Sequence, residues 1–285
     1  MKYGLIIDVS RCSGCCSCLL AVKDEYVGND YQGYSAAQPK SGQNWLDVAE
    51  VEQGEGDKVK VDYIPLMYRH NRNLKPIPGV PEGAIYVRED GLTIIDPEKA
   101  KGCRQIVDAS LDSMIFWNEE LSLPQIYTLD AHRLDKGEPL PRCVESCPAQ
   151  AMHWGDLDDP ESDVCRFIAE HASEIEDYEP EPGADYLVRY YKLPKPFITG
   201  EVLLDDKPGL CCEGAKIVLE RDGEQAAETA TDFLGDFQFT GLEKGAGYTV
   251  KVSFPGYRAH VTETDARSAR NLGTITLKRA QPASH

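Results

Sequence analysis

Three cysteines near the start of the chain have a spacing that suits metal chemistry. Cys12, Cys15 and Cys18 follow one another as C-x2-C-x2-C. A short loop of that spacing can turn three thiolates toward one face of an iron–sulfur cube. Tetrahedral zinc rarely takes three ligands from one seven-residue run, and disulfides are unusual in a chain without a secretory signal. The spacing therefore favours an iron–sulfur cluster, with zinc or free thiols as the alternatives.

A distant cysteine completes the set of four ligands. In the bacterial ferredoxin pattern the run continues as x3-C-P, and that last cysteine ligates the other cluster of a two-cluster module. Here the three residues after Cys18 are followed by Val22 and not by a cysteine. Cys147-Pro148, far along the chain, supplies the Cys-Pro pair and the fourth ligand. Cys16 lies off the spacing and is interpreted as a bystander. The sequence thus predicts one [4Fe–4S] cluster held by four cysteines: Cys12, Cys15, Cys18 and Cys147.

The second cluster of such a pair lacks its ligands. It would need a cysteine at position 22 and a C-x2-C upstream of Cys143, but residues 125–130 contain no cysteine. Cys143 is therefore left without partners. One complete ligand set survives while the complementary set is gone.

Two internal repeats indicate the elements that position these cysteines. Residues 6–15, a short apolar strand and the start of the cysteine loop, match residues 94–103, and residues 147–154 match 110–117. In the second copy the four ligand positions become Ala100, Cys103, Ile106 and Ser110. We expect duplicated bacterial-ferredoxin-like modules, the second of which has lost its cluster. Chance similarity of short apolar strings is the alternative.

The remaining pattern divides the chain into two domains of an α+β fold. Residues 1–195 form the ferredoxin-like iron–sulfur domain, with a hairpin at 84–95 and an insertion at about 31–82 that would cover the module or a partner. A helix is expected from an Asp159 N-cap, with Pro160 in its first turn. The acidic, proline-bearing stretch from about 176 to 196 is interpreted as a linker.

A second domain, residues 197–285, shows a two-residue period. Short alternating segments at 200–204, 215–219, 236–239, 248–252 and 273–277 predict an antiparallel β-sandwich of the transthyretin-like or immunoglobulin-like kind. It resembles carboxypeptidase-regulatory-like domains, with the hairpin at 231–237 as the recognisable feature. Docking or shielding is the expected role, and simple stabilisation of the chain is the alternative.

Charge and hydropathy exclude several classes of partner. Forty-eight acidic residues against 30 basic ones give a net charge of −18, which repels nucleic-acid backbones and anionic lipid. No apolar run approaches the roughly 20 residues of a membrane span. The apolar stretch within the first eight residues is too short for a signal peptide and is followed at once by an acidic residue, so a cytoplasmic protein is expected. Export together with a signal-bearing partner stays open.

No catalytic constellation is evident in this chain. The six histidines are scattered and none suggests a site by pairing with cysteine or carboxylate: His70, His132, His153, His171, His260 and His285. His132 lies near the missing ligand run, where packing is favoured over ligation. Cys165 is expected in the core, and Cys211-Cys212 as buried thiols rather than a vicinal disulfide.

Together these motifs resemble a known family. Residues 86–101, 117–120 and 141–143 and the C-terminal sandwich are similar to the small iron–sulfur subunit of pyrogallol–phloroglucinol transhydroxylase and related molybdenum hydroxylases of the dimethyl-sulfoxide-reductase family. The resemblance implies a large catalytic subunit that carries molybdenum on two pyranopterin guanine dinucleotides. It also implies a small subunit with several [4Fe–4S] clusters.

Most of the family's cluster cysteines are replaced here. By the resemblance they are missing at about Tyr68, Asn71, Pro76, Ser110, Tyr127 and Asp130. The surviving set matches the cluster nearest the molybdenum subunit. Transhydroxylation moves a hydroxyl between two rings without net redox change and so needs no long chain of clusters. The resemblance therefore favours hydroxylation or transhydroxylation of polyhydroxylated aromatics by a heterodimer.

Other functions remain open at this stage. The chain could be a structural subunit whose cluster only stabilises the fold. It could also be the electron-transfer subunit of another molybdopterin oxidoreductase, such as a catechol dehydroxylase. A free-standing ferredoxin suits the acidic charge, but the insertion and the sandwich are excess mass for a soluble carrier.

Overall fold

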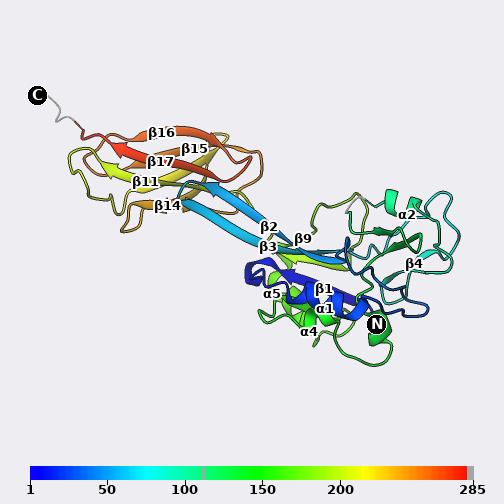
Figure 1. Cartoon of the computed structure of the whole chain (residues 1–285). Coiled ribbons are helices and arrows are strands. Elements are labelled where there is room, and N and C mark those ends of the chain that lie inside the picture. The colour runs from blue at the N-terminus through cyan, green and yellow to red at the C-terminus, as the bar shows by residue number, and fades with distance from the viewer. Residues whose placement is uncertain (111–112, 281–285) are drawn as a thin grey trace, which may run out of the picture. The chain divides into compact units, whose positions relative to one another are not determined.

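The structure is a computed structural model that describes residues 1–110 and 113–280. The chain forms two compact units (Figure 1). The first unit consists of Met1–Glu50 and Asp62–Leu193, and the second of Val51–Val61 and the chain from Pro194 onward. Residues 51–61, which the sequence placed in an insertion of the first domain, thus belong to the second unit.

A four-stranded sheet organises the first unit. Its order is β8 (Met152–Asp156), β1 (Tyr3–Asp8), β10 (Val188–Tyr191) and β9 (Ile175–Glu176). β1 pairs antiparallel with β8 and parallel with β10. The predicted linker at 176–196 is therefore wrong in part, because it contains β10. Val188 and Tyr190 are fully buried there, and the surrounding acidic and proline residues obscured this short strand.

Short helices flank this sheet (Figure 1). They are the 3-10 turn η1 (Val9–Arg11), α1 (Ser17–Tyr26), α4 (Arg142–Glu145), α5 (Asp163–His171) and the 3-10 turn η2 (Ala172–Glu174). α5 packs Val164 against Ile6 and Tyr191. Its N-cap is Ser162, whose hydroxyl accepts from the Cys165 amide at 3.3 Å, and not Asp159 as predicted. Asp159 instead accepts from the Glu161 amide in the preceding turn.

The second copy of the repeat folds into hairpins and short helices. Its elements are β4 (Ile85–Val87), β5 (Thr93–Ile95), α2 (Gln105–Asp108), β6 (Phe116–Asn118), β7 (Leu123–Gln125) and α3 (Ala131–Leu134). The repeated phrases lie on β1 and β5, and on β8 and β6. However, β1 pairs with β8, whereas β5 pairs with β4 and β6 with β7. The copies therefore share element order but differ in strand pairing.

An unpredicted two-stranded ribbon occupies the middle of the insertion. It pairs β2 (Leu46–Glu55) with β3 (Lys58–Met67). The alternation Lys58-Val59-Lys60-Val61 is a period-2 signal that could have revealed β3. Pro65, at a buried position of β3, lies within the first unit.

The second unit contains two sheets around one core. One sheet has the order β14 (Asp236–Phe239), β11 (Ile198–Leu204) and β17 (Arg270–Leu277), and the other β13 (Glu224–Ala230), β12 (Lys216–Arg221), β15 (Gly247–Ser253) and β16 (His260–Asp265). β11 and β17 are parallel, so the prediction of a wholly antiparallel sandwich is wrong for that pair. The two strands the sequence missed, β13 and β16, are edge strands with mostly polar residues.

The hairpin between β12 and β13 turns at Asp222 and Gly223. Asp222 and Gly223 both have positive φ, 53° and 84°, as a two-residue type I′ turn requires. None of the helices in the described part of the chain is long and apolar enough to cross a membrane.

Three cysteines outside the predicted cluster loops are free thiols. Cys212 is buried in the core of the second unit, as expected. Its neighbour Cys211 is exposed, so the prediction of two buried thiols is wrong for that residue. Cys165 packs at the edge of the α5 cluster and is only partly buried, because its helix lies on the surface of the sheet.

Candidate metal centre

The four predicted ligands come together at one end of the first sheet. Cys12 and Cys15 lie between β1 and α1, Cys18 lies in the first turn of α1, and Cys147 lies between α4 and β8. Because β1 and β8 are antiparallel neighbours, the end of one adjoins the start of the other, and the Asp8 amide donates to the Ala151 carbonyl at 2.8 Å. This pairing brings the distant cysteine to the loop, and all four thiols line a single cavity.

Apolar groups complete the wall of this cavity. They are Val48 and Pro65 of the ribbon, and Ala149, Ala151 and Met152 near the start of β8. The ribbon thus covers the cysteine loop, as the predicted insertion was expected to do. An apolar shell that limits water access is one of the features by which a protein adjusts the potential of an iron–sulfur cluster.

The environments of the four thiols differ. Burial raises the pKa of Cys18 to about 12 and also raises the pKa of Cys12. Cys15 is exposed, and a hydrogen bond with the Ser17 hydroxyl lowers its pKa. The Ala151 amide donates to the Cys147 sulfur at 3.4 Å, the kind of contact that adjusts cluster potential. Since iron binds thiolates, loading this site would release protons.

The donor set fits a cluster better than a single ion. Among residues 1–110 and 113–280, no group of three or more His, Cys, Asp or Glu side chains is arranged to hold one metal ion. The four thiols surround a space instead, as the ligands of an iron–sulfur cube must. Cys16 also lines this space, with a φ of 58° and its sulfur directed at the Gly14 carbonyl at 3.4 Å.

Buried side chains occupy the region of the second cluster, whose ligands the sequence lacks. Val22, Tyr127, Asp130 and Cys143 are at most 1% exposed. The Tyr127 hydroxyl donates to Asp130 at 2.8 Å, and the Arg142 amide donates to the same carboxylate oxygen at 2.6 Å. Burial raises the pKa of Asp130 despite these donors. Hydrogen-bonded protein atoms thus occupy this region.

An ion-pair network surrounds that group. His132 contacts Glu25 at 2.9 Å and stacks on Tyr31 with ring centres 3.6 Å apart. Arg142 contacts Glu25 at 3.0 Å. Burial alone would raise the pKa of Glu25, but hydrogen bonds from Tyr31, His132 and Arg142 together lower it to about 2. Packing of His132 is confirmed, whereas the expectation that the histidines lack a carboxylate partner is wrong.

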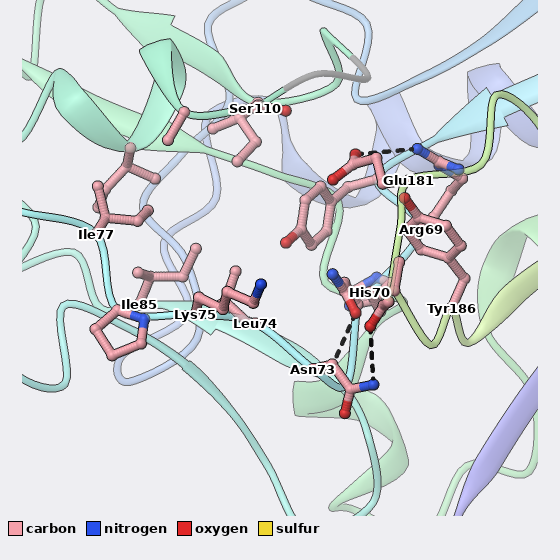
Figure 2. Close-up of a pocket in the computed structure, with 18 of the residues that line it drawn as sticks. Arg69, His70, Asn73, Leu74, Lys75, Ile77, Ile85, Ser110, Glu181 and Tyr186 are labelled. Carbon is pink, nitrogen blue, oxygen red and sulfur yellow. Dashed lines mark hydrogen bonds and ion pairs between the residues drawn. The ribbon is translucent and has the colours of Figure 1, made fainter.

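The lost site of the second repeat has become core. Ala100 and Ile106 are completely buried, and Cys103 is 8% exposed, in one apolar cluster with Ile95 and Ile115. The remaining positions that the resemblance assigns to missing cysteines are Tyr68, Asn71, Pro76 and Ser110. All four line a separate cavity (Figure 2).

Two family profiles match the chain. The 4Fe–4S dicluster domain matches residues 59–157, and the carboxypeptidase regulatory-like domain matches residues 198–278. Two [4Fe–4S] clusters need eight thiolates by the usual count of four each. The dicluster match contains only three cysteines: Cys103, Cys143 and Cys147. The fold of that domain is therefore retained with most of its ligands replaced.

Similar proteins cover most of the chain. The pyrogallol hydroxytransferase small subunit of Pelobacter acidigallici is 32% identical over 97% of this chain and 99% of its own length. A protein of Halobacterium salinarum named as a dimethyl sulfoxide reductase iron–sulfur subunit is 32% identical over 80% and 89%. The iron–sulfur subunit of the arsenate respiratory reductase of a Shewanella species is 27% identical over 60% and 88%. The chain therefore belongs to the family of iron–sulfur subunits that includes the pyrogallol hydroxytransferase small subunit and the iron–sulfur subunits of the dimethyl sulfoxide reductase family.

Proposed function

We propose that this chain is the iron–sulfur subunit of a heterodimeric molybdopterin enzyme that hydroxylates or transhydroxylates polyhydroxylated aromatic compounds. It holds one [4Fe–4S] cluster through Cys12, Cys15, Cys18 and Cys147, and it has no active site of its own. The partner is a large catalytic subunit with molybdenum on two pyranopterin guanine dinucleotides. The observation that carries the proposal is the convergence of these four thiols on one cavity.

The chain's own residues suit a centre that serves a docked partner. When bound, the cluster supplies a one-electron redox centre. Cys15 is exposed and Cys12 and Cys147 are half-buried, so the site lies close to the protein surface. Leu20, two residues beyond Cys18 in α1, is 63% exposed and offers an apolar contact beside it. Cys18, in contrast, anchors the site in the core.

The replaced ligand positions favour a reaction without net electron export. Apolar core around Ile106 and hydrogen-bonded carboxylate at Asp130 occupy two positions where further clusters would lie. A long electron route through this chain would need such clusters. Transhydroxylation needs no such electron route. The relative from Pelobacter acidigallici is named as a hydroxytransferase subunit, in agreement with this interpretation.

The proposal is tested on the complex purified without oxygen. Pyrogallol is added as the probe, and the hydroxylation pattern of the products is followed together with the cluster's low-temperature EPR signal. The proposal predicts that the wild type forms a hydroxylated or hydroxyl-transfer product from pyrogallol. The EPR signal of the cluster should be absent in Cys15→Ser and unchanged in Cys16→Ser. Full activity of a cluster-free Cys15→Ser complex would support a purely structural subunit instead.

A second outcome would support the alternative redox function. If the complex removes hydroxyl groups from catechols only when an external reductant is supplied, the chain delivers electrons to a dehydroxylase. The cluster would then be reduced before the substrate is added. The hydroxylase or transhydroxylase assignment would be wrong, while the ligand assignment would stand.

A further inference from the structure

A cavity of about 310 Å³ lies in the first unit, away from the four cysteine ligands (Figure 2). It is formed mainly by residues 68–71 and 73–78, by Ala109 and Ser110 just after α2, and by residues 181–184 and Tyr186. Its volume falls at the lower end of the roughly 300–1,000 Å³ of small-molecule sites. None of the described residues that line it is a cysteine.

The cavity coincides with replaced ligand positions. Tyr68, Asn71, Pro76 and Ser110, where the resemblance predicts missing cysteines, all contribute to its wall. Elsewhere in the chain such positions are filled, as the buried Tyr127 and Asp130 show. Here the space remains, so the replacements changed the chemistry of the wall without closing it.

Most of the wall is apolar. Ile77, Ile85, Ile106 and Ile115 contribute aliphatic surface, and Tyr68 and Tyr186 contribute aromatic rings. In Figure 2, Ile77 and Ile85 lie on one side of the cavity, opposite Tyr186. Aromatic rings and branched aliphatic side chains favour the binding of a small, planar, apolar ligand group.

Among the described residues of the wall, Lys75 is a cation without a carboxylate partner. Arg69 is paired with Glu181 at 3.6 Å and lies 3.8 Å above the ring of Tyr186. Burial lowers the pKa of His70 to about 3, so its ring is neutral. Lys75 is exposed and forms no ion pair with any residue that the structure describes. Among the described lining residues, Arg69 and Lys75 are cations and Glu181 is a carboxylate, in a chain whose net charge is −18.

We propose that this cavity binds a small aromatic carboxylate, with its ring between the isoleucine and tyrosine walls and its carboxylate paired with the Lys75 ammonium. A carboxylate pairs with the Lys75 ammonium, and the isoleucine and tyrosine side chains contact the ring. The inference does not depend on the cluster, because none of the four proposed cluster ligands lines this cavity.

The probe is 4-fluorobenzoate, titrated into the purified complex and followed by ¹⁹F NMR. Lys75→Gln removes the charge at an exposed position and should fold normally. Lys101→Gln, an exposed lysine outside the cavity, is the matched control. Ala109→Trp places a bulky group where a small, exposed residue lines the wall. The uncharged 4-fluorobenzyl alcohol tests the requirement for an anion.

Saturable binding of 4-fluorobenzoate is expected in the wild type and in Lys101→Gln. Lys75→Gln should weaken it about tenfold, the typical effect of losing a charge-assisted contact, and Ala109→Trp should abolish it. Iron content should be unchanged in every variant. If Lys75→Gln and Ala109→Trp both bound 4-fluorobenzoate with wild-type affinity, the binding site would lie elsewhere in the complex and the proposal would be overturned. Equal affinity for the alcohol, or no saturable binding, would overturn it as well.

Discussion

Gly14 lies directly against the ring of Tyr63: a Cβ on residue 14 would come within 2.6 Å of ring atom Cδ1. Gly14 also has a φ of 67°, a conformation that side-chain-bearing residues rarely adopt. The loop between Cys12 and Cys15 therefore folds closely over β3. This contact links the ribbon of the insertion to the geometry of the proposed cluster site.

Gly14→Ala should consequently impair cluster loading. The added methyl both strains the backbone and collides with Tyr63, so iron per chain should fall at least about twofold. Gly28→Ala is the control, because Gly28 has a similar φ of 73° but nothing within 4 Å. It should cost about 1 kcal/mol of stability and leave iron unchanged. Adding Tyr63→Ala to Gly14→Ala should restore part of the iron, and a failure to restore any would show that the ring is not the obstacle.

Replacing neighbouring cysteines should separate ligands from bystanders. Cys15→Ser, Cys12→Ser or Cys147→Ser should remove most of the visible absorbance of the cluster and destabilise the subunit, because each leaves an iron without its thiolate. Cys16→Ser is matched to Cys15→Ser by position and should keep the absorbance. Cys143→Ser and Cys103→Ser should keep it too. Loss of the cluster in Cys143→Ser alone would mean that the ligand set is wrongly assigned.

Glu25 should stabilise the fold over a defined range of pH. Its pKa of about 2 lies below its ordinary value of 4.5, so the folded form favours the charged carboxylate. The stabilisation is complete above about pH 4.5 and is lost as the pH falls toward about 2. Glu25→Gln should therefore lower the free energy of unfolding at about pH 7 by roughly 2 kcal/mol.

Asp24→Asn provides the comparison for that measurement. Asp24 also contacts Arg142, at 2.9 Å, but it is 72% exposed, whereas Glu25 is 13% exposed. An exposed ion pair contributes at most about 1 kcal/mol. Thermal or urea unfolding of both variants in the complex should rank them accordingly. Equal losses would contradict the importance of burial in this network.

Ile106 should act as a core residue and not as part of a cluster site. It is fully buried among Ala100, Cys103 and Ile115 in the second repeat. Ile106→Ala should cost roughly 2–4 kcal/mol through the cavity it leaves. Iron and sulfide per chain should not change. A loss of iron without a loss of stability would point to a cluster near this position.

Local spacing singled out cysteines that the fold brings to one cavity, whereas their role as cluster ligands stays a prediction. Cys12, Cys15 and Cys18 share one loop, and the Cys-Pro pair at 147 identified their distant partner. The repeat also placed strands at β1, β5, β6 and β8. How those strands pair depends on contacts distant in sequence, so the different partners of β1 and β5 were not predictable from the repeat.

Polar segments were the main source of error. β13 and β16 are edge strands whose exposed side chains hide the apolar alternation, and β10 stands in an acidic stretch that resembles a linker. The Glu25–His132–Arg142 network joins residues more than 100 positions apart, which no local motif records. The Ser162 N-cap was missed because Asp159-Pro160 gave a stronger local signal.

The central claim is that one [4Fe–4S] cluster remains in this chain, and the most direct test is iron and acid-labile sulfide per chain in the complex as purified, with low-temperature EPR after reduction. About four irons and four sulfides, with one paramagnetic species that is absent in Cys15→Ser, is the predicted result. About twelve or more irons would mean that other residues retain clusters at the replaced positions, and would contradict the single-cluster account.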